Sequence, residues 1–256
     1  MIKVKDIHVS YDSKKVLHGV NLAFSPDEFL FILGPNGAGK STLIKCINGI
    51  KSINKGDITI QERSIQEWDN VALAREIAFI PQEFYLQFDY TVRDFVMMGR
   101  FPWLGYFRNY TDRDDFITQG YIDKLDLKKL QDRLYNSLSG GEKQRVLIAR
   151  ALVQETKVIL MDESLSSLDI YHQIDILQLL KEINETEHKS IIMISHDLNQ
   201  AVEYAKRMVF LSEGQVVADG TPEEVFHAET LQKVFRIKVD FIKNPFSGKN
   251  NMVYNV

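Results

Sequence analysis

The sequence predicts an α/β protein in which helices cover a mainly parallel sheet. Three short apolar runs, at residues 29–33, 158–161 and 191–194, have the length and composition of strands buried on both faces. An amphipathic stretch at residues 168–183 separates the second run from the third and has helical periodicity. Because strands that alternate with helices usually pair in parallel, these runs indicate a parallel sheet.

Composition sets the size and class of the protein. With 256 residues, 45% of them apolar, the chain is long enough for one large α/β domain or two small ones. The net charge of −4 gives no sign of a nucleic-acid partner, and none is expected. Cys46 is the single cysteine, so no internal disulfide can form and a reducing compartment is expected. Its place inside a predicted helix indicates a packed core thiol.

The sequence shows no targeting or membrane-spanning signal. The first ten residues alternate like a strand and lack the apolar centre of a signal peptide. No apolar run approaches the roughly 18 residues that a transmembrane helix needs. We therefore expect a soluble, cytoplasmic protein that reaches a membrane only through a partner.

The remaining elements follow from periodicity and turn residues. Strands are predicted at residues 2–10, 20–24, 57–61 and 77–80, and a hairpin at residues 208–211 and 215–219. Residues 82–154 have helical spacing, most clearly at 92–98, 116–127 and 146–152. The tail from Thr221 contains two short helical patterns and a strand at residues 239–242, and after Asn244 it is expected to be poorly ordered.

A glycine-rich loop between the strand at residues 29–33 and the helical run after it is the centre of the candidate site. Residues 34–41 read G-x-x-x-x-G-K-S, the pattern of a phosphate-binding loop in its required strand–loop–helix context. Its glycines, Gly34, Gly37 and Gly39, allow turns that aim backbone N–H groups inward, and the helix start adds partial positive charge. Lys40 can reach the β- and γ-phosphates of a nucleotide, and the Ser41 hydroxyl can bind Mg²⁺.

Two further motifs have the chemistry to act on a bound nucleotide. Asp162, at the end of a predicted strand, can hold Mg²⁺, and Glu163 can polarise the water that attacks the γ-phosphate. Two acids after a strand would ordinarily be a solvated turn, and the phosphate-binding loop is what favours the metal-binding interpretation. The motif LSGGE, at residues 138–142, exposes N–H groups at a helix start, although by itself it favours an ordinary serine N-cap.

Taken together, these motifs resemble a known family. The run LSGGEKQRVLIARAL, with the phosphate-binding loop before it and ILMDE after it, resembles the ATPase subunit of ATP-binding cassette (ABC) transporters over nearly the whole chain. Residues 138–142 match the signature motif and residues 158–163 the Walker B strand. The resemblance implies a P-loop NTPase fold with a mainly parallel sheet and an N-terminal antiparallel β-subdomain. It also implies one ABC ATPase domain over residues 1–256, with a helical subdomain at about 83–155 and a C-terminal tail at about 221–256.

The same resemblance implies roles for single residues. Gln82 matches the Q-loop glutamine, His196 the switch histidine and Asp169 the D-loop aspartate, and Tyr11 lies where the family stacks an aromatic ring on adenine. Catalytic roles are implied for Glu163, His196 and Gln82, and Mg²⁺ ligands for Ser41, Gln82 and Asp162. ATP is expected to contact Tyr11, Gly34, Pro35, Asn36, Gly37, Ala38, Gly39, Lys40, Ser41, Thr42, Ser139, Gly140, Gly141, Glu142 and Asp169.

The chain departs from the family pattern at two places. Ser164 and Leu165 stand where Pro-Thr is usual after the catalytic glutamate, which bears on the rigidity of that loop. Glu142 replaces the commoner glutamine of the signature. Neither change removes a catalytic group.

One branch of the family fits best. TVRD at residues 91–94, MGRFPWLG at 98–105 and LDIYHQI at 168–174 resemble importers of iron–siderophores, haem and vitamin B12. The resemblance implies a membrane-spanning permease partner, a second copy of the chain and, indirectly, an extracytoplasmic substrate-binding protein. The ATPase would then be peripheral on the inner face of the cell membrane, with ATP held between the two copies.

Two alternatives stay open. Manganese and zinc importers share Met98-Gly99-Arg100, although no histidine spacing, including that of His172, suggests a metal site in this chain. A non-transport ABC ATPase acting on DNA or ribosomes is the other, but the segment between Gln82 and Ser139 has no sustained heptads for a coiled coil.

Aromatic and apolar residues are dense between Gln82 and the signature. Many of them are expected in the core, and those left exposed would mark a partner surface. We predict that this segment receives a short cytoplasmic helix of the permease. Its members are Phe84, Tyr85, Leu86, Phe88, Tyr90, Phe101, Trp103, Leu104, Tyr106 and Phe107.

Overall fold

The structure, a computed structural model, describes residues 2–105 and 109–254. The chain forms two compact units, one of Met1–Trp68 with Lys181–Val256 and one of Asp69–Leu180. The phosphate-binding loop belongs to the first unit and the LSGGE motif to the second. Within the described residues, every helix is too short or too polar to cross a membrane.

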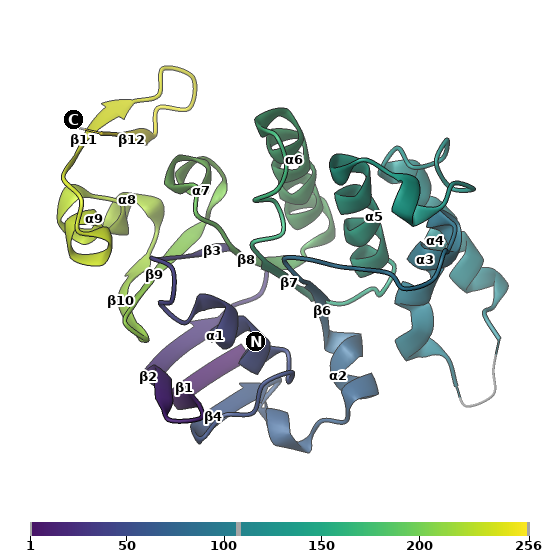
Figure 1. Cartoon of the computed structure of the whole chain (residues 1–256), viewed down its shortest axis with the longest axis horizontal. Coiled ribbons are helices and arrows are strands. Elements are labelled where there is room, and N and C mark those ends of the chain that lie inside the picture. The colour runs from purple at the N-terminus through teal and green to yellow at the C-terminus, as the bar shows by residue number, and fades with distance from the viewer. Residues whose placement is uncertain (1, 106–108, 255–256) are drawn as a thin grey trace. The chain divides into compact units, whose positions relative to one another are not determined.

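The first unit begins with an antiparallel sheet (Figure 1). Its strands are β1 (Ile2–Tyr11), β2 (Lys14–Phe24), β4 (Lys55–Ile60) and β5 (Arg63–Ser64), in the order β2-β1-β4-β5. Buried and exposed residues alternate along the first half of β1, because one face of this sheet packs against the core. The antiparallel N-terminal part is therefore confirmed, and β2 is longer than the strand predicted at residues 20–24.

Parallel pairing dominates the other sheet of this unit. The strand β3 (Phe29–Leu33) lies between β8 (Ser190–Ile194) and β9 (Arg207–Ser212) and is parallel to both. A final strand, β10 (Gln215–Gly220), forms the predicted hairpin with β9. All residues of β3 and β8 are buried, as expected for parallel strands covered on both faces.

Each of the two central strands leads into a helix. Helix α1 (Lys40–Ile47) begins after the glycine-rich loop that follows β3, and α7 (Leu198–Tyr204) begins shortly after β8. Cys46 is buried in α1, and this burial raises the pKa of its thiol to about 11. The expected packed core thiol is therefore confirmed, because so little of it is thiolate at neutral pH.

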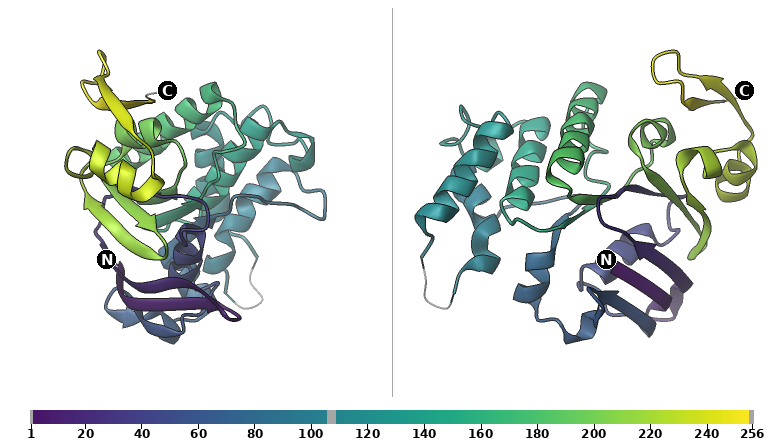
Figure 2. Two further views of the ribbon diagram at one scale, coloured as in Figure 1. Left: turned by 60° about the vertical axis from the view of Figure 1, so that its left-hand side comes forward. Right: turned by 180° about the vertical axis from the view of Figure 1, so that it is seen from behind.

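Residues 245–254 form defined structure, so the expectation that they are poorly ordered is wrong. Two short helices, α8 (Pro222–Val225) and α9 (Ala228–Phe235), lead into β11 (Val239–Lys243) and β12 (Asn250–Tyr254), which pair as an antiparallel hairpin (Figure 2). The polar residues that suggested disorder bond instead to α7. The side chains of Asn244, Ser247 and Asn251 all donate to Oε1 of Glu203, at 2.8, 2.9 and 2.8 Å.

In the second unit, β6 (Ile77–Ile80) pairs in parallel with β7 (Val158–Asp162). Between these strands in sequence, α3 (Val92–Met97), α4 (Asp112–Lys124) and α5 (Gly140–Leu152) pack side by side (Figure 2). The last helix, α6 (Ile170–Glu187), starts in this unit. A short helix that periodicity did not predict, α2 (Asn70–Glu76), begins where the Asp69 side chain accepts from Ala72 N at 2.8 Å.

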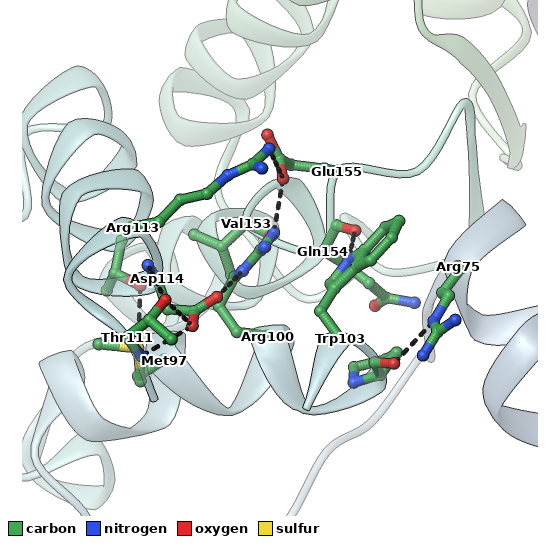
Figure 3. A network of polar contacts seen from close by, with 12 residues as sticks. Arg75, Met97, Arg100, Trp103, Thr111, Arg113, Asp114, Val153, Gln154 and Glu155 are labelled. Carbon is green, nitrogen blue, oxygen red and sulfur yellow. Dashed lines mark hydrogen bonds and ion pairs between the residues drawn. The ribbon is translucent and has the colours of Figure 1, made fainter. Parts of the chain in front are cut away.

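A buried arginine joins three segments of this unit (Figure 3). Arg100, in the short helix η2 (Met98–Trp103), donates from Nε to Asp114 of α4 at 2.8 Å. Its Nη1 donates to the Val153 carbonyl at 2.6 Å and to Glu155 at 2.8 Å, just after α5. Arg100 is only 3% exposed, and removing one partner of such a buried pair typically costs about 3–5 kcal/mol. The MGRFPW motif therefore has a structural role.

Candidate nucleotide-binding site

The phosphate-binding loop, residues 34–41, is shaped by close contacts inside the first unit. Gly34 has φ 150°, and a Cβ at this position would lie 2.0 Å from the Leu211 carbonyl oxygen. Gly39 has φ 100°, and a Cβ there would lie 2.5 Å from Cδ2 of Leu17. Glycine is needed at both positions for two reasons, the positive φ and the space. The turn after β9 also fastens the loop, because Gly214 N donates to the Ala38 carbonyl at 3.1 Å.

Lys40 spans this loop from the start of α1. It is buried, and its Nζ donates to the carbonyl oxygens of Gly34 at 2.9 Å and Pro35 at 3.1 Å. The N-cap residue of α1 is Gly39, which supplies no side-chain acceptor for the first turn. The loop therefore presents an ammonium group and a helix N-terminus together, which suits a phosphate chain.

The other predicted loop contacts belong to the same segment. Gly37 has φ 79° and no atom within 4 Å of an added Cβ, so its conformation rather than crowding favours glycine. Asn36 is exposed, Ser41 is half-buried in the first turn of α1, and Ala38 and Thr42 are buried. Ser41 thus stands beside Lys40, where a hydroxyl could bind a cation held by the same phosphates.

Two more predicted residues lie in the first unit. His196 follows β8, and Ser195 N donates to the Ile32 carbonyl of β3 at 3.4 Å, so His196 emerges at the same sheet edge as the loop. It is exposed. Tyr11, at the end of β1, is 44% exposed, with Lys51 Nζ 4.4 Å from its ring centroid. Sequence reasoning missed Lys51. Because this lysine lies over one face of the Tyr11 ring, an adenine must stack on the opposite face or displace the lysine.

The second unit holds the carboxylates and the glutamine. Asp162 ends β7 and is 3% exposed, whereas Gln82 follows β6 and is exposed. The register pairs Ile80 with Met161, so Gln82 and Asp162 leave their strands at one edge of the sheet. Both offer oxygen atoms, as does Ser41, and oxygen is the ligand that Mg²⁺ prefers. The predicted donor set therefore fits Mg²⁺ chemically.

Glu163 has an unusual backbone. Its φ of 47° lies in the left-handed region, which is uncommon for a residue other than glycine and is often found at functional sites. The loop after it is tied down without the usual Pro-Thr: Ser166 donates from N and Oγ to the Glu163 carbonyl, at 3.1 and 2.8 Å. The Gln173 amide adds a bond to the Leu168 carbonyl at 2.9 Å. These bonds hold the segment after Glu163 where Ser164 and Leu165 stand in place of Pro-Thr.

The LSGGE motif begins α5 as a complete capping box. Ser139 donates from N and Oγ to Oε2 of Glu142, both at 2.8 Å, and its Oγ accepts from Glu142 N at 3.4 Å. The bonds from the Ser139 backbone N–H and hydroxyl hold the pKa of Glu142 below its ordinary value. The N-cap interpretation is therefore correct, and Glu142 takes part in the cap. Ser139 and Gly140 stay exposed, so the helix start remains open to an anion.

The predicted site residues thus form two groups. Tyr11, the loop and His196 belong to the first unit, and the others, including Asp169 of the D-loop, belong to the second. Among the described residues, no group of three or more His, Cys, Asp or Glu side chains could hold a metal ion.

A parallel sheet, a lysine-spanned glycine loop and an open helix start define the class of P-loop nucleotide hydrolases. The comparisons with known proteins narrow this class. The sequence profile of the ABC transporter family matches residues 17–166. The petrobactin import ATP-binding protein FpuC of Bacillus anthracis is 35% identical over 243 residues, which is 95% of this chain and 89% of FpuC. The hemin import ATP-binding protein HmuV of Thermobifida fusca is 36% identical, with 97% of this chain and 86% of HmuV covered.

Solved structures agree with these relatives. An inward-facing ABC transporter described as of the metal-chelate type has a chain with a TM-score of 0.87 and 28% identity, covering 100% of this chain and 97% of that one. A dimeric ATP-binding cassette bound to ADP and Pi has a TM-score of 0.76 and 29% identity, covering 86% and 98%. The chain belongs to the ABC transporter family. Its activity is that of the family's ATP-binding subunits, ATP hydrolysis coupled to transport.

Proposed function

We propose that this chain hydrolyses Mg-ATP to power uptake of an iron–siderophore, haem or cobalamin-type substrate through a separate permease. The observation that carries the nucleotide assignment is the loop that Lys40 spans, with the N-terminus of α1, whose N-cap residue is Gly39, beside it. The import assignment is supported by relatives that are named for petrobactin, hemin and ferric enterobactin and that cover at least 95% of this chain.

The proposed chemistry divides the residues by role. Lys40 and the loop N–H groups neutralise the β- and γ-phosphates, and Tyr11 stacks on adenine. Ser41, Gln82 and Asp162 hold Mg²⁺, which when bound offsets charge on the phosphate oxygens. Glu163 orients and polarises the attacking water, and His196 donates to the γ-phosphate.

The proposed working form is a two-fold dimer with one ATP at each of two equivalent sites. The dimeric cassette that resembles this chain supports this arrangement. Ser139, Gly140 and Gly141 of one copy would meet the γ-phosphate held by the loop of the other. A two-fold contact is self-complementary, so both sites close together.

The proposed permease contact lies on the aromatic segment of the second unit. Phe84 is half-buried and packs against the buried rings of Phe95 and Tyr135, with ring centroids 5.3 and 6.4 Å away. Other members remain exposed: Tyr85, Phe88, Phe101 and Trp103 at 80%, 69%, 66% and 42%. Leu104 is half-exposed, and Tyr106 and Phe107 lie outside the described residues. Contact with the permease would hold the ATPase at the inner face of the membrane, and a substrate-binding protein would act only indirectly.

Three variants test the nucleotide and dimer assignments. Lys40→Ala is expected to lose ATP affinity and turnover together.

Glu163→Gln is expected to bind ATP, to hydrolyse it about 10²–10⁴-fold more slowly and to elute as a dimer in size exclusion. Adding Ser139→Arg should prevent that dimer. Unchanged single-turnover rates in Glu163→Gln would assign the base role elsewhere, and a monomer with ATP would count against the shared site.

Uptake assays test the substrate and the permease contact. A strain that lacks this chain should fail to accumulate one of three labelled substrates, an iron–siderophore, haem or cobalamin. Leu104→Asp is expected to abolish uptake and copurification with the permease while the isolated chain still binds ATP. Normal assembly and uptake in this variant would place the docking surface elsewhere.

A further inference from the structure

A histidine in the second unit touches two of the segments that the proposed dimer presents to its partner. His172 lies in the first turn of α6, three residues after Asp169 of the D-loop. Its ring also faces Gly141 in the first turn of α5. One side chain therefore connects the D-loop with the LSGGE motif inside a single chain.

His172 contacts Asp169 through both its ring and its backbone N–H. His172 Nδ1 lies 2.9 Å from both carboxylate oxygens of Asp169, and the His172 backbone N donates to Oδ1 at 3.0 Å. These bonds, the backbone bond first and the ring bond second, hold the pKa of Asp169 below its ordinary value. Asp169 therefore caps α6, and the ring prevents its exposed carboxylate from swinging freely.

The contact with Gly141 is equally close. A Cβ on Gly141 would lie 2.5 Å from Cδ2 of His172 and 3.0 Å from its Cγ and Nε2. Gly141 is buried, and its φ is not positive. The ring, rather than backbone conformation, is therefore what requires glycine at this position. By contrast, a Cβ on Gly140 would meet only Cδ2 of Leu168, at an ordinary 3.6 Å.

We propose that His172 is a positioning residue for ATP hydrolysis, which holds the Asp169 carboxylate and the first turn of α5 in one fixed arrangement. The inference rests on the proposed function, because both segments act on a nucleotide held by the second copy. The D-loop and the LSGGE motif then approach the partner as one rigid surface. The two segments do not have to be ordered separately when the dimer closes.

The test uses ATP-driven dimerisation of the full chain in the Glu163→Gln background. His172→Ala removes both contacts, and the ATP concentration for half-maximal dimer should rise about tenfold, the scale of losing a hydrogen bond to a charged group. His172→Asn keeps a donor at the position of Nδ1 and should restore the value to within about threefold. His188→Ala is the control, since His188 also faces an aspartate, Asp27 at 3.6 Å, but lies outside the site.

Two further measurements make the outcome decisive. Amide hydrogen exchange at residues 139–143 and 166–172 should quicken together in His172→Ala and not in His172→Asn. ATP binding by the monomer, measured with a fluorescent analogue, should not change. If the Glu163→Gln chain dimerises with ATP and adding His172→Ala leaves this dimerisation unchanged, the positioning role is refuted and the proposed function stands. If Glu163→Gln itself stays monomeric with ATP, the shared site fails and the inference fails with it.

Discussion

Gly34 and Gly39 of the phosphate-binding loop differ from Gly140 of the LSGGE motif in whether their own chain requires a glycine. Gly34 and Gly39 have positive φ, and a Cβ added to them would lie 2.0 and 2.5 Å from atoms of their own unit. Gly140 has neither property, although it is the first residue of α5 and is exposed. The backbone conformation at Gly34 and Gly39 is therefore fixed by contacts within one chain, whereas contacts within the chain do not require glycine at position 140.

This difference matches the place where each motif is proposed to act. A site that must bind phosphate in the single chain needs its shape fixed beforehand, because ordering a loop on binding costs affinity. A helix start that meets a ligand of another copy needs only to be open and correctly oriented. In the proposed dimer, Gly140 would be such a position, since it is the exposed first residue of α5.

The largest effect is expected from Gly34→Ala. Its methyl group would collide with the Leu211 carbonyl, and neither backbone can move without shifting the loop or β9. We expect ATP affinity of the isolated chain to fall roughly 100-fold, or about 3 kcal/mol, by titration calorimetry. Gly120→Ala is the control, because Gly120 lies in α4 with nothing within 4 Å and should tolerate alanine. Normal affinity in Gly34→Ala would show that the loop can remodel.

Gly140→Ala should have a smaller effect, on dimerisation and turnover rather than on ATP affinity. The isolated chain should keep its melting temperature and its ATP affinity, since exposed substitutions of this type usually stay within about 0.5 kcal/mol. ATP-driven dimerisation and turnover should fall about tenfold, because the methyl group would occupy space next to the partner's γ-phosphate. Equal turnover in Gly140→Ala and the parent chain would remove the reason given for this glycine.

Gly141→Ala should lower stability rather than nucleotide affinity. Its methyl group would overlap the His172 ring, and overpacking of this kind costs about 1–3 kcal/mol in thermal or urea unfolding. Adding His172→Ala removes the ring and should recover most of that loss. Failure of the double variant to recover would mean that another neighbour forbids a side chain at this position.

The smallest effect concerns the C-terminal hairpin, which is also fastened from within its own unit. Burial tends to raise the pKa of Glu203, but bonds from Ser247, Asn251 and Asn244 outweigh it and leave that pKa below 4.5. The stabilisation is therefore complete above about pH 4.5 and is lost as the pH falls through the lower folded value. The protection of residues 239–254 from hydrogen exchange, relative to the intrinsic exchange rate at each pH, should fall in that acidic range. Glu203→Gln should make this protection independent of pH there.

Elements with a strong local pattern were predicted well. The strands at residues 29–33, 77–80 and 191–194 and the hairpin of β9 and β10 match within one residue or two at their ends, because side-chain periodicity and turn residues act over short distances. Strand β11 was predicted at residues 239–242, whereas helix α2, strand β12 and the pairing of β12 with β11 were missed. Their stability comes from an Asp69 cap and from side-chain bonds to Glu203, which periodicity does not report.

The phosphate-binding loop could be predicted from the sequence alone, since its strand, glycine spacing, lysine and helix are contiguous and each acts on its neighbours. The capping box at Ser139 and Glu142 is likewise local, because it spans a single helical turn. Three contacts appear only in the folded chain: Leu211 forbids a side chain at Gly34, Arg100 is buried against Asp114, and His172 lies on Gly141. These contacts join segments far apart in sequence. They arise from close packing between segments, which leaves no periodic trace in the chain.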